Sequence, residues 1–569
     1  MAFHLHPFKP YLLKSLRNYD AGQFGNDLIA GITVGVLALP LAMAFAIASG
    51  LAPEAGIFTA IIGGFIISSL GGSRVQIGGP AGAFIVIVYG IVVNHGLANL
   101  LISTIMAGVL LFIMGLTRLG SLIRFIPVSI IIGFTNGIAV LIALSQLKDF
   151  LGLRIDGRIP AEFFALLQTL YAHLHTIDLT TLSLGASALA VIILWPLVVQ
   201  RLPGRLRGLT RLPGTIVALT LATLATLIWQ LPVETIGSKF GGIPQALPAF
   251  TLPDFDWATV RTLATPTITI ALLCAIESLL CARVADGMID DRHDPNQELM
   301  AQGLANFIGP FFGCMPATGT IARTSTNVRS GACSPVAGIV HALVLLAIVL
   351  VAAPLARHVP LVALAAILLY VAYNMGEWSE FPRLRQYSLP YRITMVSTFL
   401  LTVVLDLTVA VEVGLVLACV FFIYRVSSLT SIEAVKPETL PTGSTMPSGV
   451  AAYRLFGSLF FGSVGKLEAL LEVDAGAAQP GVLVLDLHHV INVDTTGLES
   501  LETLHRNLAR RGATLILCDV NQQPASLIAR AGFINTLGSA NLLPDLPAAI
   551  ERAGFLLAST RGARSSAQG

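Results

Sequence analysis

GCMPATGTIARTSTNVRSG, residues 313–331, is small, hydroxylated and basic, yet strongly apolar segments precede and follow it. Pro316 and Gly319 disfavour a continuous membrane-spanning helix, so the sequence predicts extended chain that changes into a short helix near Ile321, at membrane depth. The first N–H groups of that helix lack internal acceptors, and Arg323 adds a full positive charge. The stretch therefore predicts an anion site. The alternative, a polar surface loop, would need more connecting chain than the apolar flanks leave.

Composition places the chain among polytopic membrane proteins. Of its 569 residues 55% are apolar and only 12% are charged, whereas a soluble protein carries about 25% charged residues. The net charge of +2 gives no reason to expect a nucleic-acid partner. The six cysteines have no metal spacing, and no nucleophile with a base is visible, so we expect no metal, no cofactor and no enzyme activity.

A second interrupted segment repeats the pattern near the start of the chain. Residues 71–94, GGSRVQIGGPAGAFIVIVYGIVVN, contain Gly78, Gly79 and Pro80 in succession, and a short helix is predicted to begin at Pro80. One discontinuous element in each half of an apolar domain is typical of an inverted-repeat transporter, in which the site lies between facing half-helix N-termini.

Twelve further apolar segments bring the prediction to about fourteen transmembrane elements. They cover residues 27–48, 55–70, 97–116, 125–147, 180–200, 213–230, 266–287, 297–312, 334–355, 359–375, 392–406 and 408–425. Arginines in short loops then fall on the side of the N-terminus, which predicts a cytoplasmic N-terminus and, with an even count, a cytoplasmic C-terminal part. These arginines are Arg118, Arg124, Arg201, Arg205, Arg207, Arg211, Arg283, Arg292, Arg383, Arg385 and Arg392.

The pattern changes after the last apolar segment. Residues 436–449, KPETLPTGSTMPSG, have linker composition, and strand-like runs then alternate with an amphipathic helix, which predicts a small α/β domain. We therefore expect a transmembrane domain over residues 1–430, a linker over 431–447, an α/β domain over 448–555 and a disordered tail over 556–569.

Five segments together resemble SulP-type anion permeases, the sulfate permease family related to the solute carrier 26 transporters, with a C-terminal STAS domain. They are DLIAGITVGVLALPLAMAFA, GGSRVQIGGPAGAF, AIESLLCARVADGM, GTIARTSTNVRSGACSPVAG and VLVLDLHHVINVDTTGLESL. The resemblance implies a seven-plus-seven inverted repeat, divided into a core domain and a gate domain. It also implies a homodimer in which the core moves against the gate.

The resemblance also implies the anion pocket. Its residues would be an aromatic on the first helix and the starts of the two half-helices; here they are Phe45, Pro80, Ala81, Gly82, Ile321, Ala322 and Arg323. Some relatives have polar or aromatic groups where this chain has Leu41, Ala81 and Ala322, so this pocket has fewer groups with which to select one anion. Read without the family, Phe45 fits ordinary helix packing.

Glu277 is the costliest residue in any predicted span, since a carboxylate at mid-membrane costs about 3 kcal/mol or more. Burial favours its neutral form and a nearby cation favours its charged form, so it is our candidate proton carrier. A permanent salt bridge between Glu277 and Arg323 is the alternative. Sodium-coupled bicarbonate relatives have an aspartate here with a hydroxyl four residues later, whereas this chain has Cys281, which favours a proton over sodium.

In the tail, VINVDTTGLESL resembles the segment that bacterial anti-sigma antagonists phosphorylate, and the matching residue is Thr496. The alternative is that Asp494 and the threonines only cap a helix. We expect this domain to dock a cytoplasmic protein or to regulate transport.

The sequence thus predicts a secondary active anion transporter of the inner or plasma membrane. Sulfate, bicarbonate and C4-dicarboxylates are the substrate classes, and proton symport by alternating access is the favoured mechanism. An anion exchanger and an uncoupled channel remain alternatives, and sodium-coupled bicarbonate uptake is less favoured.

Overall fold

The computed structural model forms two compact units, Met1–Leu415 and Val416–Gly569. It describes residues 5–121, 127–155, 160, 162–200, 213–243, 245–246, 249–253, 257–405, 407–436, 446–467 and 480–566. The arginines at 124, 201, 205, 207 and 211 that contribute to the predicted orientation lie outside these ranges. The boundary between the units falls inside a helix, ahead of the expected position at residue 430.

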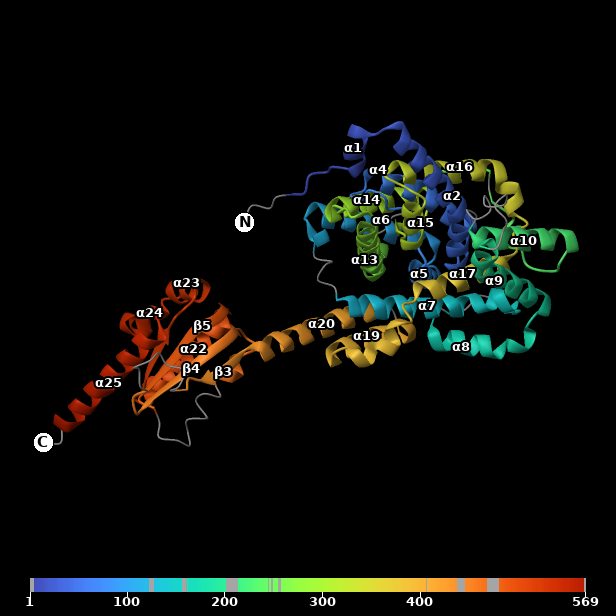
Figure 1. Ribbon diagram of the computed structural model, residues 1–569. Coiled ribbons are helices and arrows are strands. Elements are labelled where there is room, and N and C mark those ends of the chain that lie inside the picture. Colours follow the sequence, from blue (N-terminus) through green and yellow to red (C-terminus); the bar gives the residue numbers. More distant parts are fainter. Residues whose placement is uncertain are drawn as a thin grey trace. The chain divides into compact units, whose positions relative to one another are not determined.

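The first unit is built from apolar helices, and a helix lies at each predicted transmembrane position (Figure 1). Their bounds are α2 (Ala21–Ala48), α3 (Pro53–Phe58) with α4 (Gly64–Leu70), α5 (Phe84–His95), α6 (Leu97–Leu116), α7 (Val128–Leu151), α9 (Leu179–Gln200), α10 (Gly214–Trp229), α13 (Ala264–Ile289), α14 (Pro295–Ile308), α15 (Ile321–Arg329), α16 (Val336–Ala356), α17 (Leu361–Met375), α19 (Leu389–Val404) and α20 (Leu407–Leu429). Shorter helices lie before or between them: α1 (Tyr11–Ser15), α8 (Phe163–Ala172), α11 (Ile236–Phe240), α12 (Trp257–Thr262) and α18 (Glu380–Arg383).

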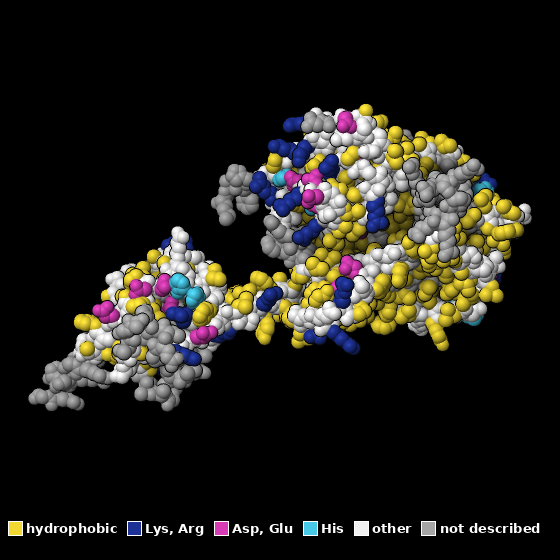
Figure 2. All heavy atoms as spheres, in the orientation of Figure 1, with side chains coloured by type: hydrophobic (Ala, Val, Ile, Leu, Met, Phe, Trp, Pro, Cys, Tyr) yellow, Lys and Arg dark blue, Asp and Glu magenta, His cyan; other side chains and the backbone are white. Residues whose placement is uncertain are grey.

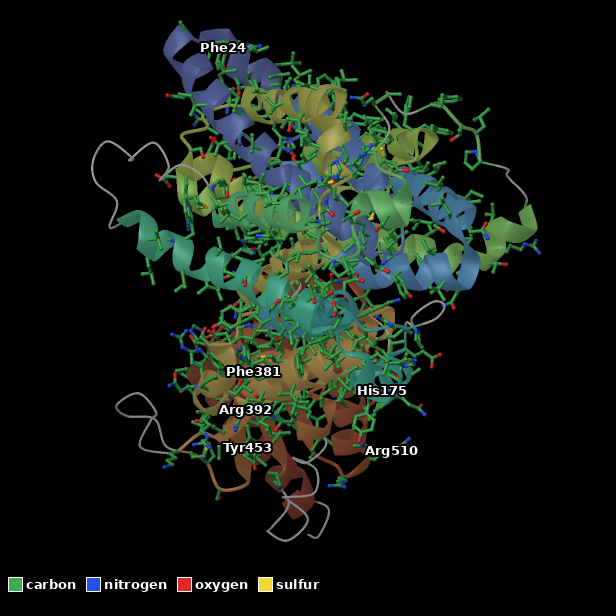
Figure 3. The ribbon with its side chains drawn as sticks, turned by 90° about the vertical axis from the view of Figure 1, so that its right-hand side faces the viewer. Phe24, His175, Phe381, Arg392, Tyr453 and Arg510 are labelled. Atoms are coloured by element: carbon green, nitrogen blue, oxygen red, sulfur yellow. The ribbon has the colours of Figure 1, made fainter. Side chains whose placement is uncertain are left out.

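The helices of this unit form two bundles. The first contains α2 to α6 and α13 to α16, with α14 against α6 and α16 against α2 as its main contacts. The second contains α7, α9, α10, α17 and α19, and here α7 contacts both α17 and α19. In Figure 3, Phe24 on α2 indicates the position of the first bundle. Phe381 on α18 contacts Phe399 of α19, and His175 follows α8, which contacts α7 and α19, so both lie beside the second bundle.

The surface of the first unit suits a bilayer. Seven of the described helices are long and apolar enough to cross a membrane, and several shorter apolar helices accompany them. Figure 2 shows apolar side chains over much of this unit and Lys and Arg side chains gathered in the region of α1. Exposed basic residues there include Lys14, Arg17, Arg118 and Arg292.

Two short strands cross in the middle of the first bundle. Strand β1 (Gly78–Gly79) pairs antiparallel with β2 (Thr318–Gly319), and each leads toward a half-helix, α5 or α15. Position 78 requires glycine, because a methyl group there would lie 2.4 Å from the side chain of Ile67. The crossing joins the two interrupted segments that the sequence identifies, although they are far apart in the chain.

The second unit contains a five-stranded sheet in the order β3-β4-β5-β6-β7. The strands are β3 (Ser431–Ala434), β4 (Val450–Leu459), β5 (Val482–Val493), β6 (Thr514–Cys518) and β7 (Leu542–Leu543); all neighbours are parallel except β3 and β4. Its described part also contains helices α22 (Thr495–Arg510), α23 (Gln522–Arg530), α24 (Phe533–Leu537) and α25 (Leu546–Ser566). The predicted α/β class is confirmed.

Three predicted boundaries differ from the structure. Helix α5 begins at Phe84 rather than at Pro80, because the chain leaves β1 through a turn in which the Phe84 N–H donates to the Ala81 carbonyl. Strand β3 takes up residues 431–434 of the expected linker, and residues 437–445 of that linker lie outside the described part. Helix α25 continues to residue 566, through most of the segment whose composition predicts disorder.

Candidate functional site

The predicted short helix near Ile321 is confirmed, and its start is the centre of the candidate site. No side chain caps α15: Thr320, its N-cap residue, instead donates its hydroxyl and its N–H to the Ile77 carbonyl. The first N–H groups of α15 therefore have no internal acceptor and no side-chain acceptor among the described residues. Because these groups carry the positive end of the helix dipole, the start of α15 favours an anion.

Arg323 lies in the first turn of α15 and is only 1% exposed. None of its three guanidinium nitrogens has a hydrogen-bond partner among the described residues. The guanidinium lies against the crossing strands, since a methyl group on Gly79 would be 2.5 Å from Nη1. A buried charge normally requires a counter-charge or hydrogen bonds. Arg323 is thus a buried cation whose donors are available to an anion.

The turn before α5 holds the second part of the predicted site. Gly82 lies between two apolar side chains, because a methyl group on it would be 3.4 Å from the ring of Phe45 and 3.5 Å from Ile142. Phe45 comes from α2 and Ile142 from α7, so both bundles meet at this turn. Phe45 and Ala81 are buried. The family-based placement of Phe45 beside this half-helix therefore agrees with the geometry.

The predicted pocket residues fall into two groups joined by β1. Phe45, Ala81 and Gly82 form one group, and Arg323 reaches β1 at Gly79, one residue before Pro80. The side chains of Ile321 and Ala322 belong to neither group, because both are exposed, Ile321 by 39%. These two residues contribute backbone N–H groups at the helix start, and their side chains lie on an open face.

Glu277 lies on α13, the helix that packs against both β2 and α15. It forms no ion pair with Arg323, since its Oε2 and all three guanidinium nitrogens lack partners within the described part of the chain. The expected alternative of a permanent Glu277–Arg323 salt bridge is therefore wrong for this conformation. One turn later, Cys281 donates its thiol to the Thr324 hydroxyl at 3.3 Å.

Glu298 is a buried carboxylate in the first bundle that the sequence interpretation missed. It is 1% exposed, and its Oε2 accepts the backbone N–H groups of Gly72 (2.9 Å) and Ser73 (3.2 Å). Its Oε1 accepts from Gln302 Nε2 at 3.0 Å and from the Ser278 hydroxyl at 3.5 Å. All four donors lie in the first bundle, so these hydrogen bonds hold the chain that leads into β1.

Two asparagines hold the crossing segments in the same way. Asn306 makes a pair of 2.8 Å bonds with Ala317, accepting from its N–H and donating to its carbonyl. Asn327 donates to the Val75 carbonyl at 2.8 Å. A sequence signal for part of this network exists, because Glu298, Gln302 and Asn306 are spaced four residues apart in an apolar segment and so share one helix face.

His341 on α16 is fully buried near the crossing. Its ring lies beside Gly64, since a methyl group there would be 3.7 Å from Nδ1 and 3.0 Å from the Gly78 carbonyl. Neither ring nitrogen makes a hydrogen bond of normal geometry to a described residue. His341 belongs to the packing around β1, and no group of three or more His, Cys, Asp and Glu side chains within the described residues could hold a metal ion.

We expect Gly319→Ala to destabilise the first bundle by about 2–4 kcal/mol, because overpacking is combined with a lost hydrogen bond. The added methyl would lie 1.7 Å from Nε2 of Gln76, which donates to the Ser278 hydroxyl at 3.0 Å. Gly90→Ala is the matched control, since no atom lies within 4 Å of the added methyl. Thermal midpoints of both variants in detergent check this, and equal midpoints would contradict it.

Two cavities flank α5 beyond this site. One of about 440 Å³ is lined by α5, α13 and α19, and it contains Glu162 and His95. The other, of about 270 Å³, is lined by the end of α2, by α5 and by α7. Val86 and Leu141 line both. Neither cavity is lined by Arg323, so the candidate site is defined by its unpartnered groups and not by these spaces.

Two family models match the chain. The model described as the Sulfate permease family matches residues 24–397, and that described as the STAS domain matches residues 445–547. A protein of Bacillus subtilis (strain 168), named "Putative sulfate transporter YvdB", is 41% identical to the chain over 526 residues. That alignment covers 92% of this chain and 96% of the relative.

Two solved structures share the architecture. The transmembrane domain of a cyanobacterium bicarbonate transporter, BicA, matches with a TM-score of 0.61 and 29% identity over 69% of this chain and 98% of that chain. The overall structure of SLC26A9 matches with a TM-score of 0.81 over 97% of this chain and 93% of that chain. At 19% identity, the SLC26A9 match shows the fold alone.

Proposed function

The chain belongs to the sulfate permease family, and from this premise we propose that it is a secondary active anion transporter that works by proton-coupled alternating access. Sulfate, bicarbonate and C4-dicarboxylates are the candidate substrates. The relatives' names include sulfate and bicarbonate transporters, and the chain's pocket has few polar side chains to select among oxyanions.

The observation that carries the proposal is the buried guanidinium of Arg323, which has no partner among the described residues and lies at the first turn of an uncapped half-helix. A bound anion would supply the missing acceptors. Because the guanidinium donates in a planar fork, it suits planar and tetrahedral oxyanions. In this proposal the anion is held by Arg323 and by the N–H groups at the starts of α15 and α5.

A competition panel in proteoliposomes tests the substrate. Purified protein would be assayed for uptake of labelled sulfate and bicarbonate, with unlabelled anions and C4-dicarboxylates as competitors. A substrate anion should also raise the thermal midpoint of the purified protein, since a ligand at 100 times its Kd stabilises the folded state by about 2.7 kcal/mol. Absence of saturable uptake for every anion would overturn the proposal.

Two arguments support movement of the first bundle against the second. Both bundles meet at Gly82, where Phe45 of α2 and Ile142 of α7 close around the turn. The anion site itself is built almost wholly from the first bundle, which is held together by the Glu298 and Asn306 hydrogen bonds. A rigid bundle carrying its site past a second bundle is one route to alternating access.

Glu277 is the proposed proton carrier. It is partly exposed on α13, and its Oε2 has no partner among the described residues, unlike the fully bonded Glu298. An uncoupled channel or an exchanger would use the same pocket without a proton. A transporter coupled to protons accumulates the anion when only an inward proton gradient is imposed, whereas a channel's flux follows the electrochemical gradient of the anion alone.

We further propose that the N-terminus and the STAS domain are cytoplasmic in an inner or plasma membrane, and that the protein is a homodimer. The basic residues around α1 support this orientation. In the STAS domain Asp494 caps α22 by accepting from the Gly497 N–H at 2.7 Å, and Thr496 is exposed in its first turn. A phosphate on Thr496 would lie at the positive end of α22, so Thr496 stays a candidate regulatory residue.

We expect deletion of residues 440–569 to lower transport activity or protein abundance without changing the order of anion preference, because no pocket residue lies in this part. The deletion also leaves β3 without β4, its antiparallel partner. The competition panel on the full chain and the deletion variant checks this. A changed order of preference would show that the STAS domain takes part in selecting the anion.

A further inference from the structure

The smaller of the two cavities lies one turn beyond the candidate site. Ile85 and Val86 of α5 line it, shortly after Gly82, and so do Ile47 and Ala48 of α2, shortly after Phe45. Phe45 and Ile142 contact the turn at Gly82, three residues before Ile85 of the cavity wall. The cavity adjoins the C-terminal end of α2, opposite the end of that helix that follows the N-terminal segment.

Fixed charges line this cavity. Lys148 and Asp149 come from the last turn of α7, and Lys239 comes from α11. The ammonium of Lys239 lies 3.6 Å from Asp149 Oδ1 and 5.9 Å from the ring centroid of Phe240. Lys148 donates to the Ile155 carbonyl at 3.3 Å. Among the described residues, the cavity wall thus has two cations and one carboxylate, a net positive charge.

A second carboxylate balances Lys239 from outside the cavity. Glu234 Oε2 lies 3.5 Å from the Lys239 ammonium, but Glu234 does not line the cavity and its side chain is 67% exposed. Water screens such an exposed pair strongly. Asp149 is better shielded, at 20% exposure. Of the described residues, Lys148, Lys239 and Asp149 therefore contribute most to the potential inside the cavity.

We propose that this cavity is a second, low-affinity anion site that captures the transported anion before it passes Phe45 and Ile142 to reach the start of α5. The inference rests on the proposed transport function. In the proposed orientation the site faces the outside of the cell. The charge of a cleft concentrates ions of opposite charge and speeds their arrival.

The chemistry of this site differs from that of the Arg323 site. A lysine ammonium acts as a point charge without the planar fork of a guanidinium, so it attracts anions by charge more than by shape. Small oxyanions such as sulfate and bicarbonate are therefore its ligand class. The larger cavity suits an anion less well, because Glu162 lines it and no lysine or arginine in the described part of the chain does.

A set of four charge-neutralising variants tests the site. We expect Lys148→Gln and Lys239→Gln to raise the KM for sulfate uptake about fivefold each at low ionic strength, with unchanged maximal rate. Asp149→Asn should lower KM by a similar factor, although it removes an ion pair. The differences should shrink at high ionic strength. Glu234→Gln is the matched control and should change KM by less than about twofold.

Sidedness and folding are checked on the same preparations. The KM measured from the other face of oriented proteoliposomes should not change, and thermal midpoints should show that all four variants fold. An unchanged KM in all the charge variants would overturn the capture site. A rise in KM for Asp149→Asn like that for the lysine variants would also overturn it. If the wild-type protein transports sulfate and the charge variants have the same KM as the wild type, only this inference fails. If the wild-type protein takes up none of the anions, the proposed function itself fails.

Discussion

We expect Arg323→Ala to abolish saturable anion uptake while the protein still folds. An oxyanion would lose two charge-assisted hydrogen bonds of about 1.5–3 kcal/mol each, so its affinity should fall by at least about 100-fold. The guanidinium has no partner among the described residues, so its removal breaks no hydrogen bond within them. The thermal midpoint without anion should therefore be unchanged or higher, and anions should no longer raise it.

Arg323→Lys is the matched control for charge. Lysine keeps the positive charge near Gly79 but lacks the planar fork, so binding should weaken less than in Arg323→Ala and the preference for oxyanions should decline. Uptake kinetics and anion-dependent thermal shifts would be measured on the wild type, Arg323→Ala and Arg323→Lys. The comparison separates the contribution of the positive charge from that of the planar hydrogen-bonding geometry. If Arg323→Ala takes up anion at the wild-type rate, the anion site does not lie at the start of α15.

We expect Glu277→Gln to abolish uptake driven by an inward proton gradient while exchange of bound anion survives. Glutamine mimics the protonated carboxyl permanently, so the bundle can still carry anion in both directions but can no longer carry a proton. The structure shows no ion pair between Glu277 and Arg323, so the substitution should leave the anion site intact. Exchange and proton-driven uptake would be measured on one preparation.

Glu298→Gln is the control that distinguishes a coupling carboxylate from a structural one. The carboxylate of Glu298 accepts two backbone N–H groups and two side-chain donors, and an amide cannot accept at both of its ends. This variant should lose thermal stability and both transport activities together. If Glu277→Gln also loses exchange together with uptake, Glu277 positions the site and carries no proton.

Much of the fold followed from local properties of the sequence. Apolar segments of sufficient length predicted the transmembrane elements. The prediction works because a backbone that spans a bilayer must satisfy its own hydrogen bonds. Pro316 and Gly319 marked an interruption, and the helix after them begins at Ile321 as predicted. The alternation of strands and helices gave the class of the C-terminal domain. Each of these signals acts within one element, so composition and spacing contain it.

The first residue of α5 could not be predicted from local sequence properties. Pro80 suits a first helical turn, yet the helix begins at Phe84 because β1 pairs with β2, and the chain must turn before a helix can form. The partner strand lies more than two hundred residues away in the sequence. A strand of two glycines has no apolar pattern of its own, so only the folded chain reveals it.

The sequence by itself determined which residues are chemically unusual: Arg323 and Glu277 as charges in apolar surroundings, and glycines where the chain is interrupted. The tertiary structure decided which of these charges have partners. Within the described part of the chain it left the Arg323 guanidinium and Glu277 Oε2 without partners, and it gave Glu298 four hydrogen-bond donors. The physical reason is that the cost of a buried charge is local, whereas the groups that offset it are brought together only by packing of distant helices.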